Sequence, residues 1–265
     1  MADYRDLVVT KKDGVGTIRI NRPEKLNALS MGAYEDLPKV CKDFDNDPEV
    51  RVVVFTGTGE RGFCAGGDID QIITQYLTWP AEKVAYFTRV SCNATRGFIT
   101  LTKPTIAAVN GVCIGAGAVL AAACDFRIAV QNARFGFVFN SLGLSGADMG
   151  ATWLLCRMLG TARAAEILLL GEIFDTAYAE KVGLVNKVVP KEKLMEEVGV
   201  LSAKLVKGPP FANKITKQAI MQQPLMNADA ALDFDAYVQA LCMVSEDHRE
   251  GYNAWREKRP AQFKG

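Results

Sequence analysis

The sequence is poor in the residues that many enzymes use for chemistry. It contains one histidine, His248, in a polar C-terminal segment, which argues against a Ser–His or Cys–His triad. The seven cysteines never occur in a C-x-x-C spacing, so neither a disulfide framework nor a structural zinc site is predicted. No cluster of His, Asp and Glu has the spacing of metal ligands. We therefore expect no metal in the site.

Strong net charge and long apolar runs are also missing. The formal net charge of +1 predicts neither nucleic acid nor a membrane surface as a partner. The longest apolar stretch, residues 112–123, is well short of the roughly 20 residues that a membrane span needs. The first six residues are polar and include acids, unlike a secretory signal or a transit peptide. These features predict a soluble, cytoplasmic globular protein.

The hydrophobic pattern along the chain alternates between strands and helices. Residues 7–11 and 16–21 are predicted to form a hairpin around Asp13-Gly14. Ser30 is an acceptable N-cap for the helix that follows it. Continuous apolar runs predict buried strands over residues 50–56, 104–109 and 126–129. The pattern favours an α/β fold, with a core over residues 1–195 and a helical region over residues 196–265.

The sequence matches two functional motifs only in part, one for binding a dinucleotide and one for a serine nucleophile. Gly57-Thr-Gly-Glu-Arg-Gly62 has the form G-x-G-x-x-G, but more loop follows it where a dinucleotide fold needs a helix. Ser145 misses the G-x-S-x-G nucleophile elbow by one position. The sequence predicts neither a nicotinamide or flavin site nor a serine nucleophile.

Two glycine-rich loops carry more information. Phe63-Cys-Ala-Gly-Gly-Asp-Ile69 and Asn110-Gly-Val-Cys-Ile-Gly-Ala-Gly-Ala118 each connect a buried strand to a helix. Amides at a helix N-terminus lack intrahelical acceptors, so one N–H from each loop could bind the same oxygen as an oxyanion hole. Gly and Ala at these places also fit tight packing of helix on strand. From the residues alone, both interpretations stay open.

Several segments together resemble the crotonase superfamily. They are Arg22-Pro-Glu-Lys-Leu-Asn-Ala-Leu29, the loop 63–69, Pro104-Thr-Ile-Ala-Ala-Val-Asn-Gly111, Ala123-Cys-Asp125, Gly183-Leu-Val-Asn186 and the C-terminal segment 255–263. They follow the order and spacing of that family and cover nearly the whole chain. The resemblance implies a spiral of ββα units with a C-terminal helical region that builds a homotrimer or a dimer of trimers.

The resemblance also implies an acyl-CoA thioester as substrate, with no cofactor beyond the coenzyme A that it carries. The two oxyanion amides would belong to Gly67 and Ala116, although the family usually has glycine at the second place. The coenzyme A channel would be lined by Lys25, Ala28, Ala65, Asp68 and Ile69. Lys258 and Phe263 would reach the coenzyme of a neighbouring subunit.

The sequence departs from this family at the catalytic acids. Hydratases of the family hold a water between two glutamates, and this chain has Val119 and Phe139 at those places. Between residues 105 and 165 only Asp125 and Asp148 are acidic. Asp125 belongs to the Cys-Asp pair after a helix and is interpreted as a structural hydrogen-bonding group. Asp148 is the remaining candidate acid–base.

Asp148 resembles the aspartate of three relatives within the superfamily. These are the dienoyl-CoA isomerases, the epoxide-CoA isomerase of phenylacetate breakdown and 4-chlorobenzoyl-CoA dehalogenase. A helix N-cap without chemistry is the alternative. We expect an enoyl-CoA isomerase whose Val119 and Phe139 exclude water from the substrate pocket. The alternatives are an enoyl-CoA hydratase or lyase, including ring-acyl-CoA hydration or hydrolysis, and a non-catalytic acyl-CoA-binding member. Residues 75–100 are expected to cover the acyl pocket, and the acyl group itself stays open.

Overall fold

Two sheets stacked along a spiral form the body of the protein. The computed structural model describes residues 4–265; residues 1–3, the start of the polar N-terminal segment, lie outside the described residues. The larger sheet has the order β1-β2-β3-β5-β7-β10, and the smaller sheet has the order β4-β6-β8-β9. Strands of the larger sheet are β1 (Leu7–Lys12), β2 (Val15–Ile20), β3 (Val52–Gly57), β5 (Thr105–Val109), β7 (Phe126–Val130) and β10 (Lys187–Val189). Those of the smaller sheet are β4 (Gly62–Cys64), β6 (Val112–Ile114), β8 (Arg134–Gly136) and β9 (Ile173–Asp175).

Each turn of the spiral adds one strand to each sheet and then a helix. The pairs β3/β4, β5/β6 and β7/β8 follow this rule, and their strands pair in parallel with the next turn. Only β1 with β2 and β8 with β9 pair antiparallel among the strands of residues 4–265. The expected ββα spiral is therefore present. Every residue of β3 and β5 is buried, because helices cover both faces of a parallel sheet.

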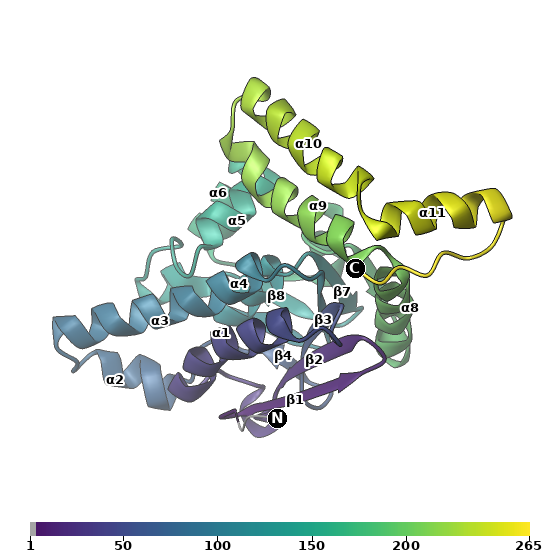
Figure 1. Cartoon of the computed structure of the whole chain (residues 1–265). Helices are drawn as coiled ribbons and strands as arrows, with labels where there is room; N and C mark the ends of the chain where they lie inside the picture. Colours follow the sequence, from purple (N-terminus) through teal and green to yellow (C-terminus); the bar gives the residue numbers. More distant parts are fainter. Residues whose placement is uncertain (1–3) are drawn as a thin grey trace.

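The local structures that the sequence predicts near the N-terminus are confirmed. β1 and β2 form the expected hairpin, in which Asp13 and Gly14 both have positive φ. The Ser30 hydroxyl accepts a hydrogen bond from Ala33 N at 3.1 Å and caps α1 (Met31–Asn46). α1 packs side by side with α3 (Ala81–Thr100), as Figure 1 shows. Between β4 and α3 lie a π-helical turn (Ile69–Ile73) and α2 (Thr74–Tyr76).

The helices of the second half fall into two groups. One group packs on the spiral: α4 (Ala116–Ala123), α5 (Ala151–Leu159), α6 (Thr161–Leu170), α7 (Thr176–Lys181) and α8 (Leu194–Lys207). The other group stands off from the sheets in Figure 1: α9 (Pro210–Gln222), α10 (Ala228–Met243) and α11 (Glu246–Glu257). α8 begins before the predicted boundary at residue 195, ends after it and covers β3, β5 and β7. That boundary stays a prediction, and α9 to α11 form what we call the C-terminal extension.

The extension is attached to the spiral by a partly buried ion pair. Lys217 of α9 lies 2.7 Å from the Asp125 carboxylate and also donates to the Lys103 carbonyl at 2.9 Å. The same carboxylate accepts hydrogen bonds from the amide and hydroxyl of Thr105. Asp125 therefore connects the start of β5 to α9, which agrees with its interpretation as a structural group. None of the helices within residues 4–265 is long and apolar enough to cross a membrane.

Lys217→Ala is expected to lower the free energy of unfolding by about 3 kcal/mol, because it leaves a partly buried carboxylate without its counter-charge. Urea denaturation followed by circular dichroism measures this change. Lys214→Ala, on the exposed side of the same helix, is the matched control and should change stability by less than about 0.5 kcal/mol. Equal stability of the two variants would contradict a structural role for the Lys217–Asp125 pair.

Candidate active site

The first glycine-rich loop is held against residue 29 by a short parallel bridge. Leu29 N donates to the Gly66 carbonyl at 2.8 Å, and Asp68 N donates to the Leu29 carbonyl at 2.9 Å. In a parallel bridge the central residue uses neither its own N–H nor its own carbonyl for pairing. Gly67, the central residue, therefore directs its N–H away from Leu29.

The second loop begins α4 directly beside the first. Gly115 has φ +57° and donates its N–H to the Gly136 carbonyl at 2.8 Å. Ala116 is the first residue of α4, so its N–H has no acceptor within the helix. A Cβ built on Gly115 would lie 3.7 Å from the Cα of Gly66, so the two loops are in van der Waals contact.

Besides Gly66 and Gly115, the contact between the two loops depends on Gly117. A Cβ on Gly117 would lie 2.3 Å from the Cys64 carbonyl oxygen, which no side chain can avoid without moving backbone. The first turn of α4 thus packs directly on β4. Within residues 4–265, neither the Gly67 N–H nor the Ala116 N–H has a hydrogen-bond acceptor. Two unpaired donors consequently stand on adjacent loops, one of them at the positive end of a helix dipole.

Apolar side chains occupy the places where the sequence lacks the two glutamates. Val119 is fully buried and follows Ala116 by three residues on α4, so both lie on the same face of that helix. Phe139 is 6% exposed and belongs to a 3₁₀ turn over Val138–Leu142. Neither side chain can accept a proton or orient a water.

Asp148 lies in the loop that leads into α5. The N-cap of that helix is Gly150, without a side-chain cap, so the alternative of an aspartate N-cap is not what the structure shows. Met149 has φ +50° and is followed by Gly150 at +88°, an uncommon backbone that turns the chain sharply after Asp148. Burial raises the pKa of the Asp148 carboxyl, against the opposing effect of a hydrogen bond from Met149 N.

The predicted coenzyme A channel starts in the segment that precedes α1. Lys25 lies 3.1 Å from Asp68 and 3.0 Å from Asp70. Asp68 is buried, lies 2.7 Å from the Arg22 guanidinium and accepts from Gln71 N at 3.0 Å. Burial acts to raise its pKa, but the Gln71 amide, Arg22 and Lys25 lower the pKa of Asp68 to about 2. Asp68 therefore holds the channel residues together as a permanent anion.

Three smaller features complete the predicted channel. Ala65 donates its N–H to the Leu26 carbonyl at 3.1 Å, which brings the first loop beside Ala28. Ala28 is 8% exposed, and its small side chain leaves the neighbouring backbone accessible. Ile69 is 68% exposed, so its side chain is accessible to a ligand in the predicted channel.

Sequence reasoning quoted Asn27 only as part of a motif and missed its role. Its side-chain amide donates to the carbonyls of Thr58 and Gly62, at 2.9 and 2.6 Å, and its Oδ1 accepts from Arg22 N. Asn27 itself has φ +58°, in the left-handed region that asparagine tolerates better than most residues. This one side chain fixes the channel segment to the loop after β3. In the sequence, the only sign of this role is the run of turn residues around Asn27.

Lys258 and Phe263 lie on the C-terminal extension rather than with the loops. Lys258 ends α11 with φ +55°, and Phe263 packs over Gly251 of the same helix. The Arg51 guanidinium donates to the Phe263 carbonyl at 3.0 Å. Within residues 4–265 no hydrogen bond or ion pair joins this pair to the two glycine-rich loops. Their predicted contact with a neighbouring subunit's coenzyme stays a prediction.

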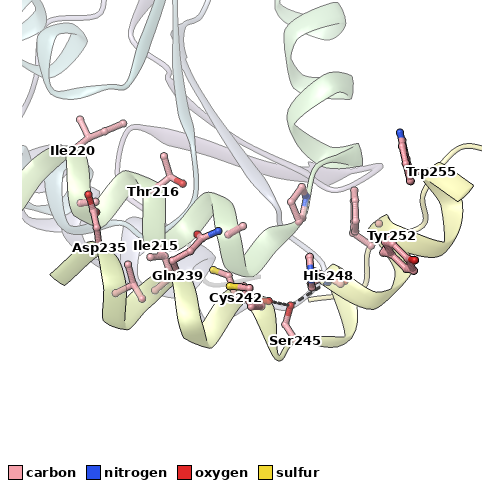
Figure 2. Close-up of a pocket in the computed structure, with 18 of the residues that line it drawn as sticks. Ile215, Thr216, Ile220, Asp235, Gln239, Cys242, Ser245, His248, Tyr252 and Trp255 are labelled. Atoms are coloured by element: carbon pink, nitrogen blue, oxygen red, sulfur yellow. Dashed lines mark hydrogen bonds between the residues drawn. The ribbon is translucent and has the colours of Figure 1, made fainter. Parts of the chain in front are cut away.

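A pocket of about 890 Å³ lies in the extension, between α9, α10 and α11. Figure 2 shows side chains of α9 and α10 pointing toward one another across it, with His248 and Tyr252 of α11 at one end. Ser245 caps α11 through the His248 amide at 3.1 Å, so this histidine is on a helix and not in a loose tail. The pocket contains none of the predicted catalytic residues. Among residues 4–265, no three His, Cys, Asp or Glu side chains are grouped to hold a metal ion.

The chain is similar to known proteins over almost its whole length. The pattern of the enoyl-CoA hydratase/isomerase family matches residues 10–265. A 1,2-epoxyphenylacetyl-CoA isomerase of Escherichia coli K12 is 38% identical over 253 residues, covering 95% of each chain. A crotonyl-CoA hydratase of Syntrophomonas wolfei is 33% identical over 260 residues, covering 98% of each chain.

Solved structures agree with the sequence relatives. The enoyl-CoA hydratase of Bacillus anthracis superposes with a TM-score of 0.93 at 30% identity, covering 98% of this chain and 100% of its own. The match extends over both sheets and the C-terminal extension, so the predicted fold is confirmed. The chain is an enzyme of the enoyl-CoA hydratase/isomerase family, within the crotonase superfamily.

Proposed function

We propose that this protein is an enoyl-CoA isomerase that moves a double bond into conjugation with a thioester. The observation that carries this proposal is a single carboxylate, Asp148, where Val119 and Phe139 replace the two acids of a hydratase. A water has no second acid to hold it there, whereas one carboxylate suffices to carry a proton between two carbons.

The chemistry requires one base and one oxyanion site. Asp148 removes a proton from Cα of a 3-enoyl thioester, and the electron pair of that C–H bond moves toward the carbonyl oxygen. The N–H groups of Gly67 and Ala116 donate to the dienolate oxygen that forms. Asp148 then returns its proton to Cγ, and the double bond ends between Cα and Cβ. Substrate and product have the same composition, so no water or cofactor is consumed.

The pH dependence of turnover should reveal the buried carboxylate. Only ionised Asp148 can accept a proton, and its pKa lies above the ordinary value of about 3.9. We expect kcat/KM to rise with pH through this raised pKa, so activity is lost on acidification earlier than for an exposed aspartate. Stopped-flow absorbance between pH 3 and 8 measures the profile. An acid limb at or below pH 3.9 would contradict the assignment of Asp148 as base.

The proposal is tested with 3-hexenoyl-CoA in heavy water, followed by mass spectrometry. Isomerisation gives a product without added water whose conjugated double bond is detected by absorbance, and deuterium enters at Cγ only in those turnovers in which the Asp148 proton exchanges with solvent before its return. In a parallel assay with conjugated 2-hexenoyl-CoA, a product heavier by one water would instead establish the second candidate, an enoyl-CoA hydratase or lyase. The names of several relatives favour that candidate, among them the crotonyl-CoA hydratase of S. wolfei. Tight binding without turnover over a broad panel of enoyl thioesters would indicate an acyl-CoA-binding member instead.

The same proposal includes the coenzyme and the assembly. Lys25, Ala28, Ala65 and Ile69 would line the coenzyme A channel, which their position around the two loops supports. A homotrimer or a dimer of trimers is supported by α10, none of whose residues is buried in the single chain. Its exposed apolar residues include Leu232, Tyr237, Leu241 and Met243. We also propose that the protein needs no cofactor besides the coenzyme A of its substrate and acts in the cytoplasm, where its free cysteines stay reduced.

A further inference from the structure

A buried arginine closes the far end of the helix that carries the second oxyanion amide. Arg127 belongs to β7 and is 6% exposed. Its guanidinium donates to the carbonyls of Ala121 and Cys124, where α4 ends, the first at 3.4 Å. It also donates to the Leu184 carbonyl at 2.6 Å and to the Asp125 carbonyl at 3.3 Å. The last carbonyls of a helix lack intrahelical donors, so Arg127 supplies donors that the apolar residues of α4 do not have.

The segment before β10 holds this arginine in place. Asn186 N donates to the Arg127 carbonyl at 3.0 Å. The Asn186 side-chain oxygen accepts from Arg127 N at 2.8 Å and from the guanidinium at 3.4 Å. Each of these hydrogen bonds of the guanidinium ends on a carbonyl or amide oxygen, and no ion pair within residues 4–265 includes Arg127. A buried charge without a carboxylate partner is uncommon, because its desolvation is costly.

Three charged groups lie together behind α4. Arg127 keeps its proton, as arginine does throughout proteins, although burial lowers its pKa. The carboxylate of Asp125 is the nearby opposite charge, and Lys217 lies 2.7 Å from it. The Cys124 thiol stays neutral, because burial raises its pKa to about 12. Two cations and one anion leave this group with an excess of one positive charge.

That excess charge acts along the axis of α4. The eight residues of the helix run from Ala116, beside the site, to Ala123, beside the guanidinium, and span about 12 Å. A helix carries partial positive charge at its N-terminus and partial negative charge at its C-terminus. In so short a helix the negative end weakens the positive potential at the other end, and Arg127 offsets it. All eight residues are buried, so water screens the interaction little.

Building on the oxyanion hole of the proposed function, we infer that Arg127 is a positioning residue that strengthens this hole by its charge, acting through α4. It touches no substrate atom. Its charge favours the negative oxygen of the enolate over the neutral oxygen of the thioester, so it promotes proton removal from Cα rather than substrate binding. Lys217 acts in the same direction and Asp125 opposes it.

Acetoacetyl-CoA tests this inference without any turnover. The carbon between its two carbonyls loses a proton readily, and the ultraviolet absorbance of the enolate reports the ionised fraction of the bound ligand as pH rises. Arg127→Met should lower the ionisation constant of the bound ligand about fivefold, as expected for one charge about 15 Å away at an effective dielectric constant of about 20. Arg127→Lys keeps the charge and should stay within about twofold of the wild type. Affinity for the neutral ligand pentanoyl-CoA should change little in either variant.

Asp125→Asn supplies a change of opposite sign. It leaves Arg127 and Lys217 unopposed, so the ionisation constant of bound acetoacetyl-CoA should rise, although by less than fivefold because this carboxylate is partly exposed. Arg157→Met is the matched control. Arg157 also donates to carbonyls at the end of a helix, those of Ile220 and Met221, but that helix, α9, carries neither oxyanion amide. This variant should leave the ionisation constant unchanged.

Two results would overturn the inference. One is equal losses in Arg127→Met and Arg127→Lys, which would show that the arginine only holds α4 in place. The other is an ionisation constant that does not rise in Asp125→Asn, which decides even if Arg127→Met does not fold. Acetoacetyl-CoA has no double bond to move. Ionisation that follows the charge, together with no turnover of 3-hexenoyl-CoA, would therefore disprove the isomerase proposal and leave this inference standing.

Discussion

Asp148→Asn should lower kcat at least a hundredfold and leave the affinity for a saturated acyl-CoA within a factor of two. The amide has nearly the same shape as the carboxylate and can occupy the same place in the turn before α5. It cannot accept a proton from Cα, however, and a positioned acid–base contributes about 10²–10⁴ to the rate. Because Val119 and Phe139 are apolar, neither of them can take over proton transfer.

Steady-state rates with 3-hexenoyl-CoA and titration with pentanoyl-CoA measure the two halves of this prediction. Asp13→Asn is the matched control, since Asp13 is an exposed residue in the β1–β2 turn and asparagine tolerates its positive φ. It should leave both quantities unchanged. Full turnover by Asp148→Asn would remove this residue from the mechanism and favour a hydratase whose water is held by other groups.

Ala116→Pro should lower kcat by about 10²–10³, because it deletes one of the two oxyanion donors. The substitution replaces the amide hydrogen with the Cδ of the proline ring, which also fills part of the place where the thioester oxygen would bind. Ala116 is the first residue of α4, a position where proline is over-represented in helices because that N–H has no intrahelical acceptor. The lost donor lowers kcat, since the charge on the thioester oxygen develops only as the proton leaves Cα, and the ring carbon is expected to raise KM as well.

Thr161→Pro provides the matched control for this variant. Thr161 is also the first residue of a helix, α6, and follows a glycine N-cap as Ala116 does, but it is exposed and outside the site. Both variants should show thermal midpoints close to that of the wild type, and only Ala116→Pro should lose turnover. A full rate in a folded Ala116→Pro would show that the second loop supplies no catalytic N–H.

The relatives do not by themselves decide between isomerase and hydratase. Among the matched proteins, one acts as an isomerase of an epoxide and another as a hydratase of crotonyl-CoA, at similar identity to this chain. Both names are compatible with one oxyanion hole, because that element stabilises the same kind of enolate in either reaction. The side chains beside the oxyanion hole, Asp148 together with Val119 and Phe139, therefore have to decide the chemistry, and the Asp148→Asn experiment addresses the first of them.

Long and strongly patterned elements could be predicted from sequence. The β1–β2 hairpin, the buried strands β3, β5 and β7 and the cap by Ser30 all follow from local rules, and the structure confirms them. The smaller sheet could not be predicted. Its strands β4, β6, β8 and β9 are three residues long, too short to show a period of two, and they form only because the spiral stacks them side by side.

By itself, the sequence determined the superfamily, the two glycine-rich loops and the single acid, because each depends on residue identity at a motif position. Tertiary structure alone decided which amides are left unpaired, since the direction of the Gly67 N–H follows from its bridge to Leu29, distant in sequence. It also decided how far Asp148 is buried, and this burial is what raises the pKa of its carboxyl. Burial and hydrogen-bond partnership are properties of packing between distant segments, and no local pattern encodes them.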